Sequence, residues 1–487
     1  EIQGWMILIL GWVFVPFYTR SMVYTMPEFL ERRYNPQSRT ILSVISLVSY
    51  VLTKVAVTVY AGGLVFQQVF GIKELWGIDF FWIAAIGLVV LTALYTIFGG
   101  MKSVLYTSVL QTPILLLGSL IILVLGFKEL GGWDEMMRVC GAVTVNDYGD
   151  TMTNLIRSND DANFPWLGAL IGSAIIGFWY WCTDQFIVQR VLSGKNEKEA
   201  RRGTIFGAYL KLLPVFLFLI PGMIAFALHQ KYIGAGGEGF LPMLANGTAN
   251  ADAAFPTLVA KLLPAGVKGL VVCGILAALM SSLASLFNSS AMLFTIDFYK
   301  RFRPETPEKK LVGIGQIATV VIVILGILWI PIMRSVGDVL YTYLQDVQSV
   351  LAPGIAAAFL LGICWKRTSA QGGMWGLIAG MIIGLTRLGA KVYYSNAGEV
   401  ADSTFKYLFY DMNWLFFCGW MFLFCIIVVI VVSLATEAPT AEKIQGLVFG
   451  TATKEQKAAT RASWDHWDII HTVIILAITG AFYWYFW

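Results

Sequence analysis

Polar and aromatic side chains gather where one apolar stretch ends, in the segment 177–190. Three consecutive aromatic residues at 179–181 are followed by a threonine, an aspartate and a glutamine at 183–185. Hydroxyl, carboxylate and amide groups are poor material for a helix that faces lipid, because hydrocarbon offers them no hydrogen-bond partner. The same residue types are good material for a binding site, so this segment is predicted to hold a ligand.

Two lysines lie inside apolar stretches, Lys54 and Lys211. A charged ammonium is costly within a bilayer, so an intramembrane lysine is a candidate functional residue by default. For Lys54, a structural pairing with a carboxylate or with backbone carbonyls is favoured over contact with a substrate. Together with the aromatic residues at 179–181, the two lysines predict an aqueous cavity inside the protein.

A third polar pattern consists of small residues at helical spacing. Ala278, Ser281, Ser282 and Ser285 recur at i, i+3, i+4 and i+7, so they share one face of a helix. Serines at such spacing commonly form a packing seam between membrane helices. The alternative is a site for a hard cation such as sodium, which several neutral oxygens can bind. Gln345 leaves a similar choice, because its amide either hydrogen-bonds a hydroxylated solute or joins two helices.

The elements that position these residues are predicted to be membrane helices. Of the 487 residues, 57% are hydrophobic and only 13% are charged, with a mean hydropathy of +0.71, and a soluble domain of this composition would expose too much apolar surface. A helix of about 20 residues crosses a bilayer and satisfies its own backbone polar groups there. Twelve such spans are predicted, at 2–19, 41–69, 80–99, 103–127, 165–189, 203–228, 265–296, 311–333, 338–364, 371–390, 412–435 and 468–486.

The distribution of basic residues predicts how the spans are oriented. If residue 1 is extracytoplasmic and each span reverses the side, most of the 34 Lys and Arg residues fall in segments assigned to the cytoplasm. Both chain ends are therefore predicted to be extracytoplasmic, in an integral protein of the cytoplasmic membrane that is surrounded by the lipid bilayer. The chain begins with Glu rather than Met, which we interpret as the start of a fragment.

Several classes of function are disfavoured. The six cysteines show no CxxC spacing and the three histidines stand apart, so neither a disulfide framework nor a metal site other than sodium is expected. The spans hold no His/Asp/Ser constellation of the kind that a membrane-embedded enzyme would need. No nucleic-acid partner is expected.

Glycines and prolines predict features of the chain path. The fifth span contains Gly168 and the run 172–177, and discontinuous transporter helices commonly break beside small residues, so a bend is expected close to Gly177. The segment Phe98–Ser103 is expected to form a tight turn between the third and fourth spans. Pro214 is expected to kink the sixth span.

Four separated motifs resemble the sodium/solute symporter family, and most closely its sodium/glucose cotransporter branch. They occur in the expected order and are spread over nearly the whole chain. The motifs are Trp179–Gln185 with Val188–Arg190, Tyr209–Pro214, Ser281–Ser285 with Phe287–Asn288, and Phe359–Gly362 with Trp365–Arg367.

The resemblance implies an all-α polytopic membrane protein with a leucine-transporter-type core of two inverted five-helix repeats. This core, which works by alternating access, would occupy residues 1–365, and peripheral helices would occupy residues 366–487. By motif, Glu1 matches the glutamate at the start of the family's second core helix. Two helices that normally precede it, including the first core helix, are therefore expected to be absent from this chain.

The resemblance also implies a solute site formed by Glu1, Tyr180, Trp181, Lys211 and Gln345. The chemistry fits a sugar, because an aromatic face can cover the C–H face of a pyranose. The carboxylate, ammonium and amide groups can satisfy hydroxyls around its edge.

For sodium, the resemblance implies the carbonyl of Ala278 and the hydroxyls of Ser281 and Ser282, completed by backbone oxygens of the absent helix. In the family's YTD motif, this chain has Ser108 in place of the aspartate, so Ser108 and Ser285 mark a candidate second-ion or gate region. We therefore expect one sodium per solute. A second departure is Asp346, which follows Gln345 where a small polar residue is expected.

The expected function is secondary active symport, in which sodium influx drives uptake of a monosaccharide such as glucose or galactose. The alternative within this class is a sodium-coupled transporter of inositol, another small polyol or a carboxylate. A sugar sensor or a channel would also fit the sequence, and a membrane enzyme is less favoured. Neither the particular sugar nor an oligomeric state is predicted.

Overall fold

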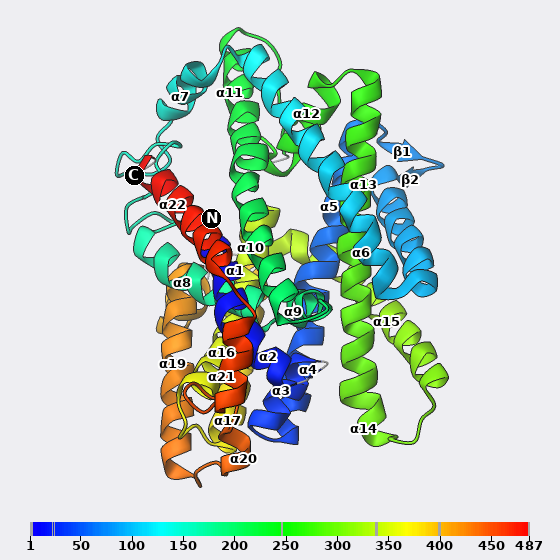
Figure 1. Ribbon diagram of the computed structural model, residues 1–487. Coiled ribbons are helices and arrows are strands. Elements are labelled where there is room, and N and C mark those ends of the chain that lie inside the picture. Colours follow the sequence, from blue (N-terminus) through cyan, green and yellow to red (C-terminus); the bar gives the residue numbers. More distant parts are fainter. Residues whose placement is uncertain are drawn as a thin grey trace.

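The structure is a computed structural model that describes residues 3–21, 23, 25–244, 247–336, 339–397 and 401–485. The described chain is almost entirely helical, and its one sheet pairs β1 (Glu74–Leu75) with antiparallel β2 (Ile78–Asp79) (Figure 1). Several α-helices continue into π-helical segments, which carry the label η; only η5 is a 3-10 turn.

The helices of the first half, in chain order, are α1 (Gln3–Ile9), η1 (Leu10–Phe14), α2 (Val15–Ser21), α3 (Met26–Arg33), α4 (Pro36–Ser49), η2 (Tyr50–Val55), α5 (Ala56–Phe70), α6 (Phe80–Leu130), α7 (Trp133–Gly141), α8 (Trp166–Phe178), η3 (Trp179–Thr183), α9 (Gln185–Leu192), α10 (Glu197–Pro214), η4 (Val215–Leu219) and α11 (Ile220–Gly234). Those of the second half are η5 (Ala251–Ala253), α12 (Ala254–Leu262), α13 (Ala265–Met292), η6 (Leu293–Tyr299), α14 (Lys300–Phe302), α15 (Glu308–Val336), α16 (Leu340–Cys364), α17 (Ala370–Asn396), α18 (Thr404–Lys406), η7 (Tyr407–Asp411), α19 (Trp414–Ala435), α20 (Ala441–Ile444), α21 (Lys454–Ala462) and α22 (His466–Tyr485).

Among the described residues, ten helices are long and apolar enough to cross a membrane. The pair Gly4–Ser21 and Met26–Arg33, bent by 73°, would make an eleventh. The prediction of twelve spans is therefore not confirmed. The difference arises at the predicted span 80–99, where the apolar helical segment Phe80–Leu94 is too short to count as a span.

The tight turn predicted at Phe98–Ser103 is wrong, because the backbone there is helical and α6 continues through it for 51 residues. Two adjacent glycines lower helix stability without forbidding a helix. A straight helix of this length would measure about 77 Å, more than twice the hydrocarbon thickness of a bilayer. Figure 1 shows that α6 is not straight, since its light-blue beginning and its cyan end run in different directions.

The fifth predicted span is discontinuous, as expected. Helix α8 passes into η3, Asp184 then takes an extended conformation (φ −79°, ψ 126°), and α9 begins at Gln185. Helix α8 ends at Phe178, one residue after Gly177, and the π-helical η3 follows, so the helix changes close to the predicted position, while the extended residue Asp184 lies further along. Gly172 of α8 serves packing: a Cβ added there would lie 2.7 Å from the carbonyl oxygen of Leu415 on α19.

At Pro214, where a kink was predicted, α10 ends and the π-helical segment η4 follows; the kink itself stays a prediction. Proline cannot donate a backbone hydrogen bond, and its ring crowds the preceding turn.

Helix α16 forms the centre of the molecule, and 83% of the residues in its most apolar 18-residue stretch are buried. It packs against α8, η3, α17 and α19. Its backbone comes close to α17, where a Cβ added at Gly354 would lie 3.0 Å from the Cα of Gly380. This packing fixes Gln345, near the start of α16, relative to the aromatic segment η3.

Candidate functional site

The break between η3 and α9 is held by the carboxylate of Asp184. Its Oδ2 forms an ion pair with the ammonium of Lys54, and its Oδ1 accepts hydrogen bonds from the Tyr50 hydroxyl at 2.8 Å and the Phe186 N–H at 3.1 Å. Asp184 and Lys54 are both buried. The structural reading of Lys54, as the partner of a carboxylate, is therefore confirmed.

Four aromatic rings surround the Lys54 ammonium. Their centroids lie 4.4 Å away for Phe186, 4.7 Å for Tyr50, 5.0 Å for Tyr180 and 5.9 Å for Trp179. The negative faces of these rings attract a cation, which adds to the ion pair. A buried charge pair needs such further partners to offset the cost of removing both charges from water. Lys54 thus orients Tyr180, one of the predicted solute contacts.

The rings of Tyr180 and Trp181 form a corner. Their centroids are 5.2 Å apart and their planes stand at 83°. Both side chains are half-buried. Within the described residues, the buried indole N–H of Trp181 has no hydrogen-bond partner. Because buried donors in proteins are nearly always paired, this N–H is available to an oxygen of a bound solute.

Gln345 is buried on α16, which packs against η3. Nearby, the Tyr343 hydroxyl donates to the carbonyl of Leu52 at 3.0 Å and accepts from the indole of Trp329 at 2.6 Å, which ties the start of α16 to η2. The described part of the chain provides no hydrogen-bond partner for the Gln345 amide. This favours a solute contact over a helix-joining role.

Lys211 lies half-buried on α10. Its neighbour Leu212 and the predicted solute contact Trp181 pack against one hydrophobic cluster, to which α1 contributes Ile7 and Leu8. The structure therefore brings α10 and η3 together against α1. Glu1, which precedes α1, lies outside the described residues.

The predicted sodium residues lie on α13. Ser281 is buried, and its hydroxyl lies 2.5 Å from the hydroxyl of Ser108 on α6. A predicted sodium ligand therefore contacts the residue that replaces the aspartate of the YTD motif. Ala278 is half-buried and Ser282 is exposed. Ser281 and Ser282 thus have different surroundings, although both lie on α13 within one turn of Ala278.

Ser285, one turn further along α13, contacts α9 rather than α6. Its hydroxyl accepts a hydrogen bond from the guanidinium of Arg190. The neighbouring Gln189 amide donates to the Ser289 hydroxyl at 2.5 Å and reaches the Ser285 carbonyl at 3.4 Å. The serine face of α13 is therefore bound by two polar side chains of α9.

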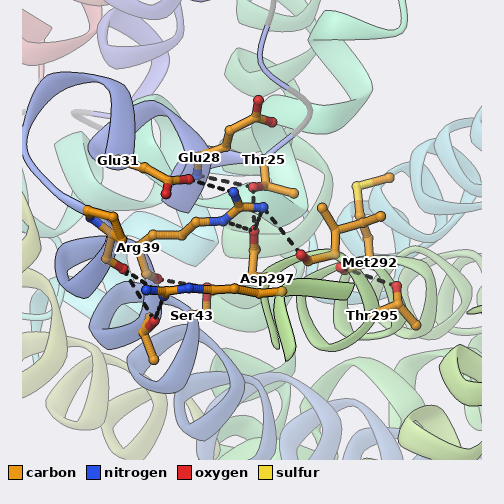
Figure 2. A network of polar contacts seen from close by, with 12 residues as sticks. Thr25, Glu28, Glu31, Arg39, Ser43, Met292, Thr295 and Asp297 are labelled. Atoms are coloured by element: carbon orange, nitrogen blue, oxygen red, sulfur yellow. Dashed lines mark hydrogen bonds and ion pairs between the residues drawn. The ribbon is translucent and has the colours of Figure 1, made fainter. Parts of the chain in front are cut away.

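A second buried charge cluster lies where α13 continues into η6 (Figure 2). The carboxylate of Asp297 is completely buried; it accepts from Arg39 Nε at 2.6 Å and from the Thr25 hydroxyl at 3.1 Å. Arg39 also pairs with Glu31 at 2.6 Å. Thr25 additionally caps α3 by accepting from the Glu28 N–H at 3.2 Å, so the cluster ties α3 and α4 to η6.

The unexpected Asp346 next to Gln345 pairs with cations of α17. Lys391 forms an ion pair with its carboxylate, and the Arg387 guanidinium lies 3.6 Å away. The acidic group beside the predicted solute contact is therefore neutralised from the neighbouring helix.

Sequence reasoning placed Asp184, Gln189 and Arg190 in the predicted ligand-binding segment 177–190 but gave them no individual partners. A signal for Asp184 existed, because few carboxylates lie inside the predicted spans and Lys54 needs one. Arg190 and Gln189 belong to the motif at 188–190, but nothing in their spacing shows that they face the serines of α13.

The chain matches a known protein family and several of its members. A protein-family model described as "SSF: Sodium:solute symporter family" matches residues 2–380. The chain is 36% identical to the sodium/mannose cotransporter SLC5A10 of Bos taurus, over 99% of this chain and 83% of that protein. It is 35% identical to the sodium/myo-inositol cotransporter 2 of Homo sapiens, over 93% and 68%. It is 37% identical to the sodium/glucose cotransporter 1 of Ovis aries, over 89% and 67%.

A solved structure described as the substrate-bound outward-open state of a Na+-coupled sialic acid symporter has a similar fold. It matches with a TM-score of 0.67 over 90% of this chain and 84% of that one. The sequences are 21% identical, so this similarity concerns the fold alone.

Proposed function

Because this chain belongs to the sodium:solute symporter family, we propose that it couples sodium influx to the uptake of a monosaccharide such as glucose or galactose. Sodium is the coupling ion and the chain is an integral membrane protein with several spanning helices. Its relatives are sodium-coupled transporters, so the membrane-enzyme alternative is set aside.

The observation that carries the sugar assignment is a pair of polar groups beside aromatic rings, of which the Trp181 N–H is fully buried and the Gln345 amide belongs to a residue that is 8% exposed. The Trp181 N–H and the Gln345 amide have no partner within the described residues, and they belong to elements that pack together. The rings of Tyr180 and Trp181 offer two apolar faces at nearly a right angle. A pyranose matches this combination, with C–H faces for the rings and hydroxyls for the donors.

A polyol such as inositol is the second candidate, since one relative is named as a sodium/myo-inositol cotransporter. A carboxylate solute is less favoured, because Lys54 is already paired with Asp184 and the proposed site sets the carboxylate of Glu1 against the ammonium of Lys211. Glu1 and Lys211 complete the proposed solute site.

For sodium we propose the Ala278 carbonyl and the hydroxyls of Ser281 and Ser282, in a core of two inverted five-helix repeats over residues 1–365. A second sodium at Ser108 and Ser285 is disfavoured. Ser108 supplies no negative charge, and the guanidinium of Arg190 already binds Ser285. Like charges placed close together in a protein interior repel strongly.

Purified protein in proteoliposomes tests the proposal. Uptake of radiolabelled glucose, galactose, mannose and myo-inositol is measured with an inward sodium gradient and with an equal potassium gradient. The proposal expects accumulation of one of the monosaccharides above equilibrium only with sodium. Accumulation of myo-inositol alone would favour the polyol alternative. Equilibration without accumulation in either salt would indicate a channel, and binding without uptake would indicate a sensor.

A further inference from the structure

Three serines form a row along α13. Ser281, Ser285 and Ser289 stand at i, i+4 and i+8 and are all buried. Ser281 belongs to the proposed sodium site, and the two serines beyond it are bound by Arg190 and Gln189 of α9. Helix α9 therefore covers the sodium site on the side toward which α13 runs, and this is the cytoplasmic side if Phe80–Leu94 crosses the membrane as the third of the twelve predicted spans.

Helix α9 is also joined directly to the segment that carries the proposed solute contacts. Only Asp184 separates α9 from η3, which carries Tyr180 and Trp181. Phe186 on α9 lies between two cations, with its ring centroid 4.4 Å from the Lys54 ammonium and 5.0 Å from the Arg190 guanidinium. Contacts therefore run without a gap from the Tyr180 ring through Lys54 and Phe186 to Arg190.

Two properties make this contact suited to opening and closing. It consists of hydrogen bonds to hydroxyls and a carbonyl, which water can replace when the helices separate. It also lies next to a single extended residue, Asp184, and hinges commonly consist of a few residues at the ends of elements.

We propose that Arg190, supported by Gln189, is the cytoplasmic gate of the sodium path, and that separation of α9 from α13 releases sodium from Ser281. With the guanidinium on Ser285, sodium leaving along the serine row meets a fixed positive charge. A solute held at Tyr180 and Trp181 acts on this gate through the break at Asp184, which couples the two fluxes. This inference rests on the proposed function and on the predicted orientation.

The test compares sodium and sugar fluxes in the same proteoliposomes. Influx of 22Na is measured with and without the transported sugar, for wild type, Arg190→Gln and Arg190→Lys. Arg190→Gln should raise sugar-independent sodium influx about tenfold or more, as expected when a charge-assisted hydrogen bond is lost. Arg190→Lys keeps the charge and should leak less. The amount of sugar moved per sodium should be highest in wild type, lower in Arg190→Lys and lowest in Arg190→Gln.

Arg138→Gln is the matched control, because Arg138 is exposed and, within the described residues, its side chain pairs only with Glu135 on its own helix α7. Should Arg190→Gln fail to fold, Ser285→Ala removes the acceptor with little change in volume and should produce a leak of the same kind. If Arg190→Gln and Ser285→Ala both keep the wild-type ratio and show no leak, Arg190 is a packing residue and the inference is wrong. Wild-type protein without sodium-dependent uptake would instead overturn the proposed function.

Discussion

The ammonium of Lys54 and the carboxylate of Asp184 form a buried ion pair, although they are 130 residues apart in the chain. One lies in the π-helical segment η2 and the other at the break between η3 and α9. The pair holds the conformation of the aromatic segment next to it. Mutation of the two residues, singly and together, can therefore measure how much the ion pair contributes to the stability of the fold.

Asp184→Asn is expected to destabilise the protein by about 3 to 5 kcal/mol, because it leaves the Lys54 ammonium buried without a counter-charge. Lys54→Met should cost a similar amount. In the double variant Lys54→Met/Asp184→Asn both charges are absent, so a large part of the loss should be recovered. Thermal unfolding in detergent measures this coupling, and additive losses in the double variant would contradict it.

Gln345→Ala should weaken sugar binding by about 1 to 2 kcal/mol, or roughly five- to thirty-fold, because one hydrogen bond to a sugar hydroxyl is lost in a buried site. Sodium activation should barely change. Sugar affinity is measured at saturating sodium, and thermal stability serves as the control. A fall in stability with unchanged sugar affinity would return Gln345 to a role in joining helices.

Ser282→Ala should raise the sodium concentration needed for half-maximal uptake by roughly five- to a hundred-fold, since a neutral oxygen ligand contributes about 1 to 3 kcal/mol. Sugar affinity at saturating sodium should change less. Ser282 is exposed whereas Ser281 contacts Ser108, so Ser281→Ala tests the other proposed hydroxyl in a different environment. Unchanged sodium activation in both variants would show that the serines only pack against neighbouring helices.

The protein is expected to carry one sodium per sugar. Each sodium gains about 2.3 kcal/mol per 100 mV and about 1.4 kcal/mol per tenfold gradient. One ion at 100 mV and a tenfold gradient thus supplies roughly 3.7 kcal/mol, enough for about 500-fold accumulation. The reversal potential of the sugar-dependent current, recorded at several sodium gradients, gives the ratio. A value near two would mean that another group neutralises the second ion near Arg190 and Ser108.

The sequence predicted most spans, because bilayer thickness requires long apolar runs that are visible in a single chain. It also predicted the discontinuity in the fifth span, since small residues up to Gly177 are followed there by the aromatic residues at 179–181. The extended residue Asp184 could not be located from the glycines, because glycine has two uses: Gly172 permits the close packing of α8 on α19 and does not mark flexibility.

The contacts of the site were harder to predict than its residues. Nothing local to Ser285 shows that a guanidinium from α9 binds it, and nothing local to Arg39 points to Asp297. Such pairs depend on which helices become neighbours, which hydrophobic periodicity does not specify. Asp346 shows the same limit, because the sequence marked it as unusual while its partner Lys391 became evident only from the packing of α16 on α17.

The Asp297 cluster has a consequence for biosynthesis. Arg39 and Thr25 precede Asp297 by 258 and 272 residues, so both are made long before their partner. At about 5 to 20 residues per second, Arg39 waits roughly 13 to 50 s for the carboxylate to emerge. During that time Glu31 is already available to pair with its guanidinium, and water and headgroups at the membrane surface can solvate the rest. The ends of α3 and α4 therefore gain their link to η6 only after α13 has been made, and a ribosome that stalls before Asp297 leaves them without this anchor.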